Sequence, residues 1–112
     1  SGFRTLVDGR PDTWWAAEVA QPELDFKLPK PVTFSVIRIG EAIQFGQRID
    51  AVAVERWDSG AWDQIATATS IGPRRLIRLD KPVTAARVRL RVTSASAIPV
   101  LSEFGLFAEP TV

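Results

Sequence analysis

Apolar and polar residues alternate over several short stretches of the chain. From Leu24 to Leu28 every second residue is apolar, and from Arg87 to Val92 arginines alternate with aliphatic residues. Such alternation is typical of half-buried β-strands, because successive side chains of a strand point to opposite faces. We predict strands at residues 24–28, 34–39, 49–57, 61–68, 74–79, 86–93 and 104–108.

Prolines and glycines separate the predicted strands. Pro29-Lys30-Pro31 should end the first strand and Lys81-Pro82 the fifth, because proline cannot donate a ladder hydrogen bond. Asp58-Ser59-Gly60 predicts a tight hairpin between the third and fourth strands. The segment Leu28–Thr33 recurs in similar form as Leu79–Thr84. We interpret the two copies as turns of the same type.

The strand pattern leaves little of the chain for helix. Only residues 11–19 and 95–100 could form a helical turn, and both stretches are short enough to be interpreted as loops. Short strands separated by frequent turns predict an all-β fold, an antiparallel β-sandwich or barrel. A length of 112 residues suits one domain, which we place at residues 1–112.

The charge balance excludes some partners. Fourteen Lys and Arg residues against thirteen Asp and Glu give a formal charge of +1, so no strong field attracts nucleic acid. No apolar run approaches the roughly 20 residues that cross a bilayer, so we expect no membrane partner. We expect a monomer in isolation, and Ser1-Gly2 suggests a fragment of a longer protein.

The chain contains no histidine and no cysteine. Their absence excludes Ser-His-Asp and Cys-His catalytic arrangements and removes the commonest ligands of zinc, copper and iron. No glycine-rich phosphate-binding motif is present either. A carboxylate pair of the kind used by glycosidases remains conceivable, but we expect this chain to be non-catalytic.

An early loop collects oxygen donors. Asp8, Asp12 and Thr13 lie in a segment that is bent by Gly9 and Pro11. Calcium prefers about six to eight oxygen ligands, many of them backbone carbonyls. Asp side chains in such loops also accept hydrogen bonds from their own backbone, so the residues alone leave a calcium site and an Asx turn open.

The loop between the second and third strands carries a second candidate site. Glu41, Gln44, Gln47 and Arg48 offer charged and amide hydrogen-bonding groups, and Phe45 offers an aromatic face. This set suits a hydroxyl-rich ligand such as a sugar. Equally, the loop could be structural, with the charged groups paired with each other or with backbone.

Arginines and tryptophans form the remaining chemical features. Six arginines cluster in and before the sixth predicted strand: Arg74, Arg75, Arg78, Arg87, Arg89 and Arg91. We interpret the alternating ones as a solvated strand face that is paired with acidic neighbours, since the chain is nearly neutral. The tryptophans at 14, 15, 57 and 62 are assigned mostly to the core.

The order of these features resembles the discoidin-like, or coagulation factor type C, β-sandwich family. The resemblance rests on Asp8-Gly9 with Thr13 and Trp14, the Asp58-Ser59-Gly60 turn before Trp62, the strand from Arg87 to Leu90, and Ser102-Glu103-Phe104. It implies a galactose-binding-like jelly-roll sandwich over nearly the whole chain.

A narrower resemblance concerns glycoside hydrolases. Glu41 with Gly46-Gln47-Arg48-Ile49, Ile71-Gly72 and Leu101-Ser102-Glu103-Phe104 is similar to the C-terminal β-sandwich of bacterial family 29 α-L-fucosidases. This implies an accessory module whose parent enzyme is secreted or periplasmic and has its active site elsewhere. The sugar-binding histidine that is common among discoidin-like members is absent here.

The resemblance also implies roles for particular residues. Asp8, Thr13 and Glu103 would hold a structural calcium ion. Glu41, Gln44, Phe45, Gln47 and Arg48, with Trp15 and Arg74 nearby, would meet either a weakly bound glycan or the catalytic domain of the parent. The two partners are alternatives, and with the second partner this chain would be a purely structural domain that binds no sugar.

Overall fold

A computed structural model describes residues 4–9, 15–16, 23–42 and 46–108, and all of its regular elements are strands. They are β1 (Arg4–Gly9), β2 (Trp15–Ala16), β3 (Glu23–Glu41), β4 (Ile49–Asp58), β5 (Ala61–Thr69), β6 (Arg75–Ala95) and β7 (Val100–Ala108). All paired strands run antiparallel. Within the described ranges, no helix has the length and apolarity to cross a membrane. The all-β antiparallel prediction is therefore confirmed.

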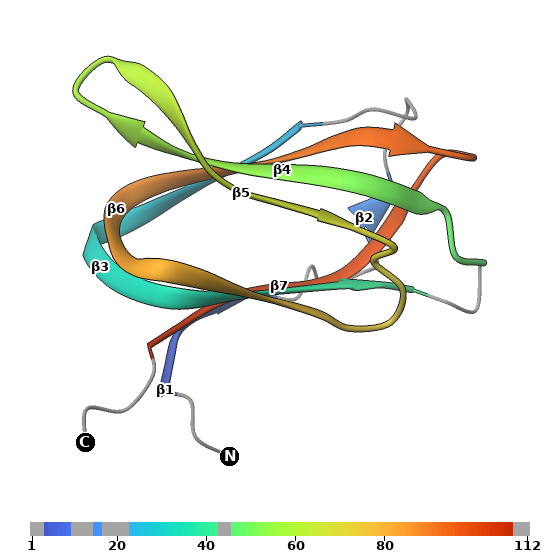
Figure 1. Ribbon diagram of the computed structural model, residues 1–112, viewed down its shortest axis with the longest axis horizontal. Coiled ribbons are helices and arrows are strands. Elements are labelled where there is room, and N and C mark those ends of the chain that lie inside the picture. Colours follow the sequence, from blue (N-terminus) through green and yellow to red (C-terminus); the bar gives the residue numbers. More distant parts are fainter. Residues whose placement is uncertain (1–3, 10–14, 17–22, 43–45, 109–112) are drawn as a thin grey trace.

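The strands form one sheet that folds back on itself. Its order is β1-β7-β3-β6-β4-β5, with β2 beside β7. The second half of β3, Val36–Glu41, lies beside β7, whereas β4 lies beside the second half of β6. Figure 1 shows β3 and β6 curving together at the left, so that each strand contributes to both layers of the sandwich. Strands that pass from one layer to the other at a bulge or bend form the corners of such sandwiches.

The bend lies where the prolines interrupt the strand pattern. Residues 28–31 of β3 face Ala86 alone, because the register moves from Lys27↔Arg87 to Val32↔Ala85. The prediction that β3 ends at these prolines is wrong. A bulge leaves residues out of the ladder, so the missing proline N–H disrupts no pairing there.

β6 contains the matching bulge. Residues 79–82 face Ser35 alone, since the register moves from Phe34↔Val83 to Val36↔Arg78. The predicted strand end at Lys81-Pro82 is therefore also wrong, and β6 is continuous. The two similar segments are facing bulges rather than two turns. Between them Thr33 pairs with Thr84, and their hydroxyl oxygens are 2.7 Å apart.

The hairpin between β4 and β5 agrees with the sequence prediction. Trp57 pairs with Trp62, and Asp58 pairs with Ala61. Ser59 and Gly60 have φ angles of 50° and 95°, the left-handed pair that a type I′ turn requires. Strands β4 and β5 begin and end within one residue of their predicted bounds.

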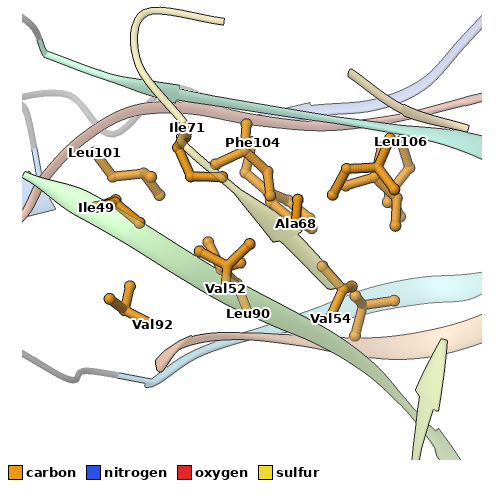
Figure 2. Close-up of a cluster of buried hydrophobic side chains, with 14 of the residues drawn as sticks. Ile49, Val52, Val54, Ala68, Ile71, Leu90, Val92, Leu101, Phe104 and Leu106 are labelled. Carbon is orange, nitrogen blue, oxygen red and sulfur yellow. The ribbon is translucent and has the colours of Figure 1, made fainter. Parts of the chain in front are cut away.

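The core lies between the two layers. Ile49, Val52 and Val54 of β4 meet Leu90 and Val92 of β6, together with aliphatic and aromatic side chains of β7 (Figure 2). Phe26 of β3 stacks on Phe104 of β7 with ring centroids 4.4 Å apart. Since each fully buried large aliphatic side chain contributes about 1.5–3 kcal/mol, this cluster holds the layers together.

Candidate functional site

Three connections meet at one end of the sandwich, which we call the loop end. They are the described residues of the β3–β4 connection (42 and 46–48), the β5–β6 connection (residues 70–74) and the β6–β7 connection (residues 96–99). They lie at the right of Figure 1, away from the bend of β3 and β6. Backbone hydrogen bonds tie this end together. Ser96 N–H donates to Arg48 O, Ala42 N–H donates to Val100 O at the start of β7, and Glu41 N–H at the end of β3 donates to Gly72 O.

Glu41 organises the loop end from inside. Its side chain is only 2% exposed. Oε1 accepts hydrogen bonds from the backbone N–H groups of Arg48 (2.7 Å) and Ile49 (2.9 Å), and Oε2 accepts one from Gly72 (2.8 Å). Charged acceptors make strong hydrogen bonds to buried N–H groups. Glu41 was expected either to contact a ligand or to pair within the loop, and the structure shows it paired with backbone. This carboxylate therefore positions the loops and does not reach the surface.

Gly72 is the partner of Glu41 on the second connection. Its N–H donates to the carboxylate and its carbonyl accepts from Glu41 N–H at 2.7 Å. The φ of Gly72 is 66°, a left-handed conformation that other residues adopt at a cost. A Cβ at this position would come within 3.1 Å of Gln47 Nε2, so the Gln47 amide lies directly against this turn.

Arg48 joins the first connection to the third. Its Nη1 donates to the carbonyl of Ile98 at 2.8 Å, and its own carbonyl accepts from Ser96 N–H at 2.9 Å. The Arg48 side chain is half-buried, whereas Gln47 is exposed. A guanidinium carries five N–H donors, so the bond to Ile98 leaves most of them for other acceptors.

The other expected contact residues have different placements. Gln44 and Phe45 lie outside the described residues. The backbone of Trp15 in β2 pairs with Leu101, and on the opposite side of β7 Leu101 pairs with Glu41. Arg74 follows the Gly72 turn and is 63% exposed at its side chain. The described expected contact residues thus converge on the loop end, although they are far apart in sequence.

The expected calcium ligands are only partly described. Thr13 lies outside the described residues, and the backbone of Asp8 pairs with Gly105, two residues from Glu103. Glu103 is 5% exposed, and its Oε1 lies 3.3 Å from Arg38 Nε and 3.7 Å from Arg74 Nε. Among the residues that the structure describes, Glu103 Oε2 is buried and has no hydrogen-bond partner. Across the described ranges, no three Asp, Glu, His or Cys side chains gather as a metal site.

Comparison with known proteins identifies the family. The F5/8 type C domain family matches residues 2–104. The chain belongs to this family. It is 32% identical over 114 residues to alpha-L-fucosidase 1 of Arabidopsis thaliana, a match that covers 96% of this chain and 22% of that protein. The chain therefore spans about a fifth of the length of this curated relative.

Solved structures agree with this F5/8 type C assignment. A GH29 fucosidase of Ruminococcus gnavus in complex with fucose is 34% identical, with a TM-score of 0.76 over 88% of this chain and 20% of that one. The family 32 carbohydrate-binding module of EndoD from Streptococcus pneumoniae has a TM-score of 0.75 at 17% identity. That match covers 96% of this chain and 97% of the module, and it confirms the sandwich fold.

A second polar region of this F5/8 type C domain covers the outer face of β3, β6 and β4. Arg87 binds Asp25, and Arg89 and Arg91 both bind Glu55, at 2.6 and 3.2 Å. The hydrogen bond from Arg87 lowers the pKa of the Asp25 carboxyl below its ordinary value. The interpretation of this arginine stripe as a strand face paired with acidic neighbours is confirmed.

The two described tryptophan side chains also lie on this outer face. Trp57 is 38% exposed and Trp62 is half-buried, and their rings meet edge to face at 5.3 Å. The guanidinium carbon of Arg89 lies 4.1 Å from the ring centroid of Trp62, a cation–π contact. The core placement expected for most of the tryptophans does not hold for these two, because their positions in the hairpin share the face of Glu55 rather than that of Val54.

Sequence reasoning did not identify Gly72 or Ile98 as individual site residues. Gly72 stood in the recognised Ile71-Gly72 pair, but its bond to Glu41 spans 31 positions. Ile98 follows a stretch of alternating serines and alanines and precedes Pro99, and it is 44% exposed.

Proposed function

We propose that this F5/8 type C domain is a non-catalytic, carbohydrate-binding-type accessory module of an α-L-fucosidase, and that its loop end contacts glycan. The supporting observation is that the buried Glu41 carboxylate accepts the hydrogen bonds of the loop N–H groups. The Arg48 guanidinium and the exposed Gln47 amide therefore remain available at the surface. The chain is similar to about a fifth of an α-L-fucosidase, and this similarity supports an α-L-fucosidase as the parent enzyme.

The chemistry of the loop end suits hydroxyl groups. Arg48 and Arg74 present N–H donors, and the Gln47 amide both donates and accepts. Held by three connected loops, these groups have less freedom to lose when a ligand binds. A few such hydrogen bonds correspond to weak binding, since a millimolar dissociation constant is only about 4 kcal/mol. Such affinity would raise the local concentration of a polymeric substrate for the linked enzyme.

Titration with fucosylated and galactosylated oligosaccharides tests this proposal. Gln47→Ala and Arg48→Ala should each weaken binding about tenfold, whereas Lys30→Ala, an exposed substitution at the bend, should leave it unchanged. Chemical shifts or calorimetry at glycan concentrations of tens of millimolar would report the constants. If the native protein binds none of these glycans, the proposal is wrong.

The alternative is that the loop end packs against the catalytic barrel of the parent and binds no sugar. The exposed side chains of Leu76 and Ile98, at 43% and 44%, favour this reading, because such residues suit a protein neighbour. Hydrogen exchange of the full-length parent would separate the two functions. Protection of residues 46–48 and 70–74 without added glycan, relative to the isolated module, would support the structural role.

We also propose that a structural calcium ion binds at Glu103, with Asp8 and Thr13 as further side-chain ligands. The proposal is supported by Glu103 Oε2, which is buried and has no hydrogen-bond partner in the described part of the chain. Bound calcium would supply positive charge that ties the early loop to β7. A ligand that binds only the folded state at 100 times its dissociation constant adds about 2.7 kcal/mol of stability. Calcium should raise the melting temperature of the native protein but not of Glu103→Gln, and an unchanged native midpoint would refute the site.

A further inference from the structure

Strand β5 is an open edge of the sheet. Among the described strands, β4 is its only ladder partner, so its other side carries unpaired backbone groups. Figure 1 shows the β4–β5 hairpin projecting beyond the rest of the sandwich. Proteins protect such edges with charged side chains, prolines or bulges, because an unpaired strand readily pairs with another chain. Of the nine residues of β5, only Asp63 is charged and none is proline.

Two other free edges of the described sheet are better protected. The first half of β3, which pairs with β6 alone, has a charged residue at every second position: Glu23, Asp25 and Lys27. The first half of β6 begins with Arg75, whose Nη1 donates to Leu76 O at 3.0 Å and so covers a carbonyl of that edge. By comparison, β5 has little charge along its edge.

Alternation along the strand locates the backbone groups of β5 that face outward. Ser70 N–H donates to Asp50 O, on the side of β4. Thr69 and Thr67 therefore direct their backbone groups away from β4. In agreement, Thr69 O accepts from Arg75 Nε at 3.3 Å instead. Thr67 is exposed and is the next outward position along the strand.

The hairpin fixes the outward positions in the other half of β5. A two-residue turn is closed by a hydrogen bond between its flanking residues, here Asp58 and Ala61. Gln64, three residues after Ala61, therefore directs its backbone groups away from β4. Between Gln64 and Ala66 the register shifts, and Ile65 is the extra residue of a bulge. The outward positions 64 and 67 are thus three residues apart instead of two.

This bulge selects the partner. It protects the edge against a regular strand, because outward groups three residues apart do not match a two-residue repeat. They do match a strand that has a bulge at the same place, and β3 and β6 already pair through facing bulges within the chain. We propose that β5 pairs antiparallel with β5 of a second copy of this chain, with Gln64 of each copy opposite Thr67 of the other.

The side chains are compatible with this register. Asp63 of one copy would lie opposite Ala68 of the other, so no like charges meet. Gln64 and Thr67 are both exposed, and their polar side chains can hydrogen-bond across the new pair. Two identical edges related by a twofold axis form a closed dimer. This dimer differs from the monomer that we expect from the sequence.

Association in solution provides the first test. One short strand pair is a small contact, so we expect a dissociation constant between roughly 1 μM and 1 mM. The mass of the native protein from sedimentation or light scattering should rise toward twofold over this concentration range. Thr67→Pro removes the outward N–H and should leave the protein monomeric, since proline is tolerated on an edge strand. Thr67→Ser keeps this N–H and should dimerise like the native protein.

Cross-linking tests the register itself. The chain contains no cysteine, so introduced cysteines react without background. Gln64→Cys combined with Thr67→Cys should link two copies under mild oxidation, because residues directly opposite each other have Cβ atoms about 4.5–5.5 Å apart. Gln64→Cys combined with Lys30→Cys, a second pair of exposed positions, should not form this link.

Three outcomes would overturn the inference: a native protein that stays monomeric at about 1 mM, a dimer that persists in Thr67→Pro, or a dimer without the 64–67 cross-link. Melting curves would verify that each variant folds. If Thr67→Pro does not fold, Gln64→Pro, at the other outward position, replaces it. Glycan titration of the native protein reports on the proposed function separately, whichever oligomeric state is found.

Discussion

The loop end and the outer face of β4 and β6 each contain a buried carboxylate, but different donors satisfy them. Glu41 is 2% exposed and accepts from three backbone N–H groups. Glu55 is 7% exposed and accepts from the side chains of Arg89 and Arg91. Both arrangements satisfy a buried charge, as burial requires.

The difference decides where binding capacity remains. On the outer face the arginines direct their donors at Glu55, Glu23 and Asp25, so few are left for a ligand. At the loop end the backbone satisfies Glu41, and Arg48 keeps donors at the surface. Arginine content alone would have favoured the outer face as the binding site. Because carboxylates already accept from the arginines of the outer face, whereas Glu41 accepts from backbone, the loop end is the better candidate.

The largest expected effect is that of Glu41→Ala. This substitution leaves two buried backbone N–H groups, those of Ile49 and Gly72, and the part-buried N–H of Arg48 without an acceptor, at a cost of about 1–3 kcal/mol for each buried group. We expect the free energy of unfolding to fall by about 4 kcal/mol in chemical denaturation. Gln47→Ala, an exposed neighbour, should change it by less than about 0.5 kcal/mol. A loss below about 1 kcal/mol for Glu41→Ala would show that water replaces the carboxylate.

A smaller effect is expected for Glu55→Ala. Removing this acceptor leaves Arg89 and Arg91 with Glu23 as their remaining carboxylate, and we expect about 2 kcal/mol of destabilisation. The same change should make the outer face attract anions, so the variant should be retained on a sulfated column more strongly than the native protein. Unchanged retention would contradict the explanation that Glu55 neutralises this face.

The smallest effect concerns pH and the pair of Asp25 and Arg87. Since the hydrogen bond from Arg87 lowers the pKa of Asp25 in the folded state, the pair stabilises the protein above the ordinary pKa of 3.8. That contribution is lost as the pH falls through the lowered folded value. Asp25→Asn should therefore reduce stability at pH 7 and flatten its decline between pH 5 and 2. An identical acid profile for both proteins would refute the assignment.

Much of the fold was predictable from local pattern. Alternation located β4 and β5 to within a residue, because each strand has one face in the core and one in solvent. The Asp58-Ser59-Gly60 turn is equally local. The strand ends at Pro29 and Lys81 were mispredicted because a bulge depends on the partner strand, which the local pattern does not contain.

The candidate site was predictable as a region rather than residue by residue. The segment from Glu41 to Arg48 was identified by its mixture of charged and amide groups. Its division into a buried organiser, Glu41, and surface groups, Gln47 and Arg48, required knowledge of where Gly72 and Ile98 lie. Those partners are 31 and 50 positions away in the chain.

The sequence by itself determined the all-β class, the hairpin and the pairing of strand arginines with acidic residues. The absence of histidine excluded the common catalytic triads from the sequence alone. Only the tertiary structure decided that Glu41 faces inward, that Trp57 and Trp62 lie outside the core, and that Ile98 meets Arg48. Strand periodicity is a local property of neighbouring residues, whereas the satisfaction of a buried charge depends on which distant backbone groups the fold brings to it.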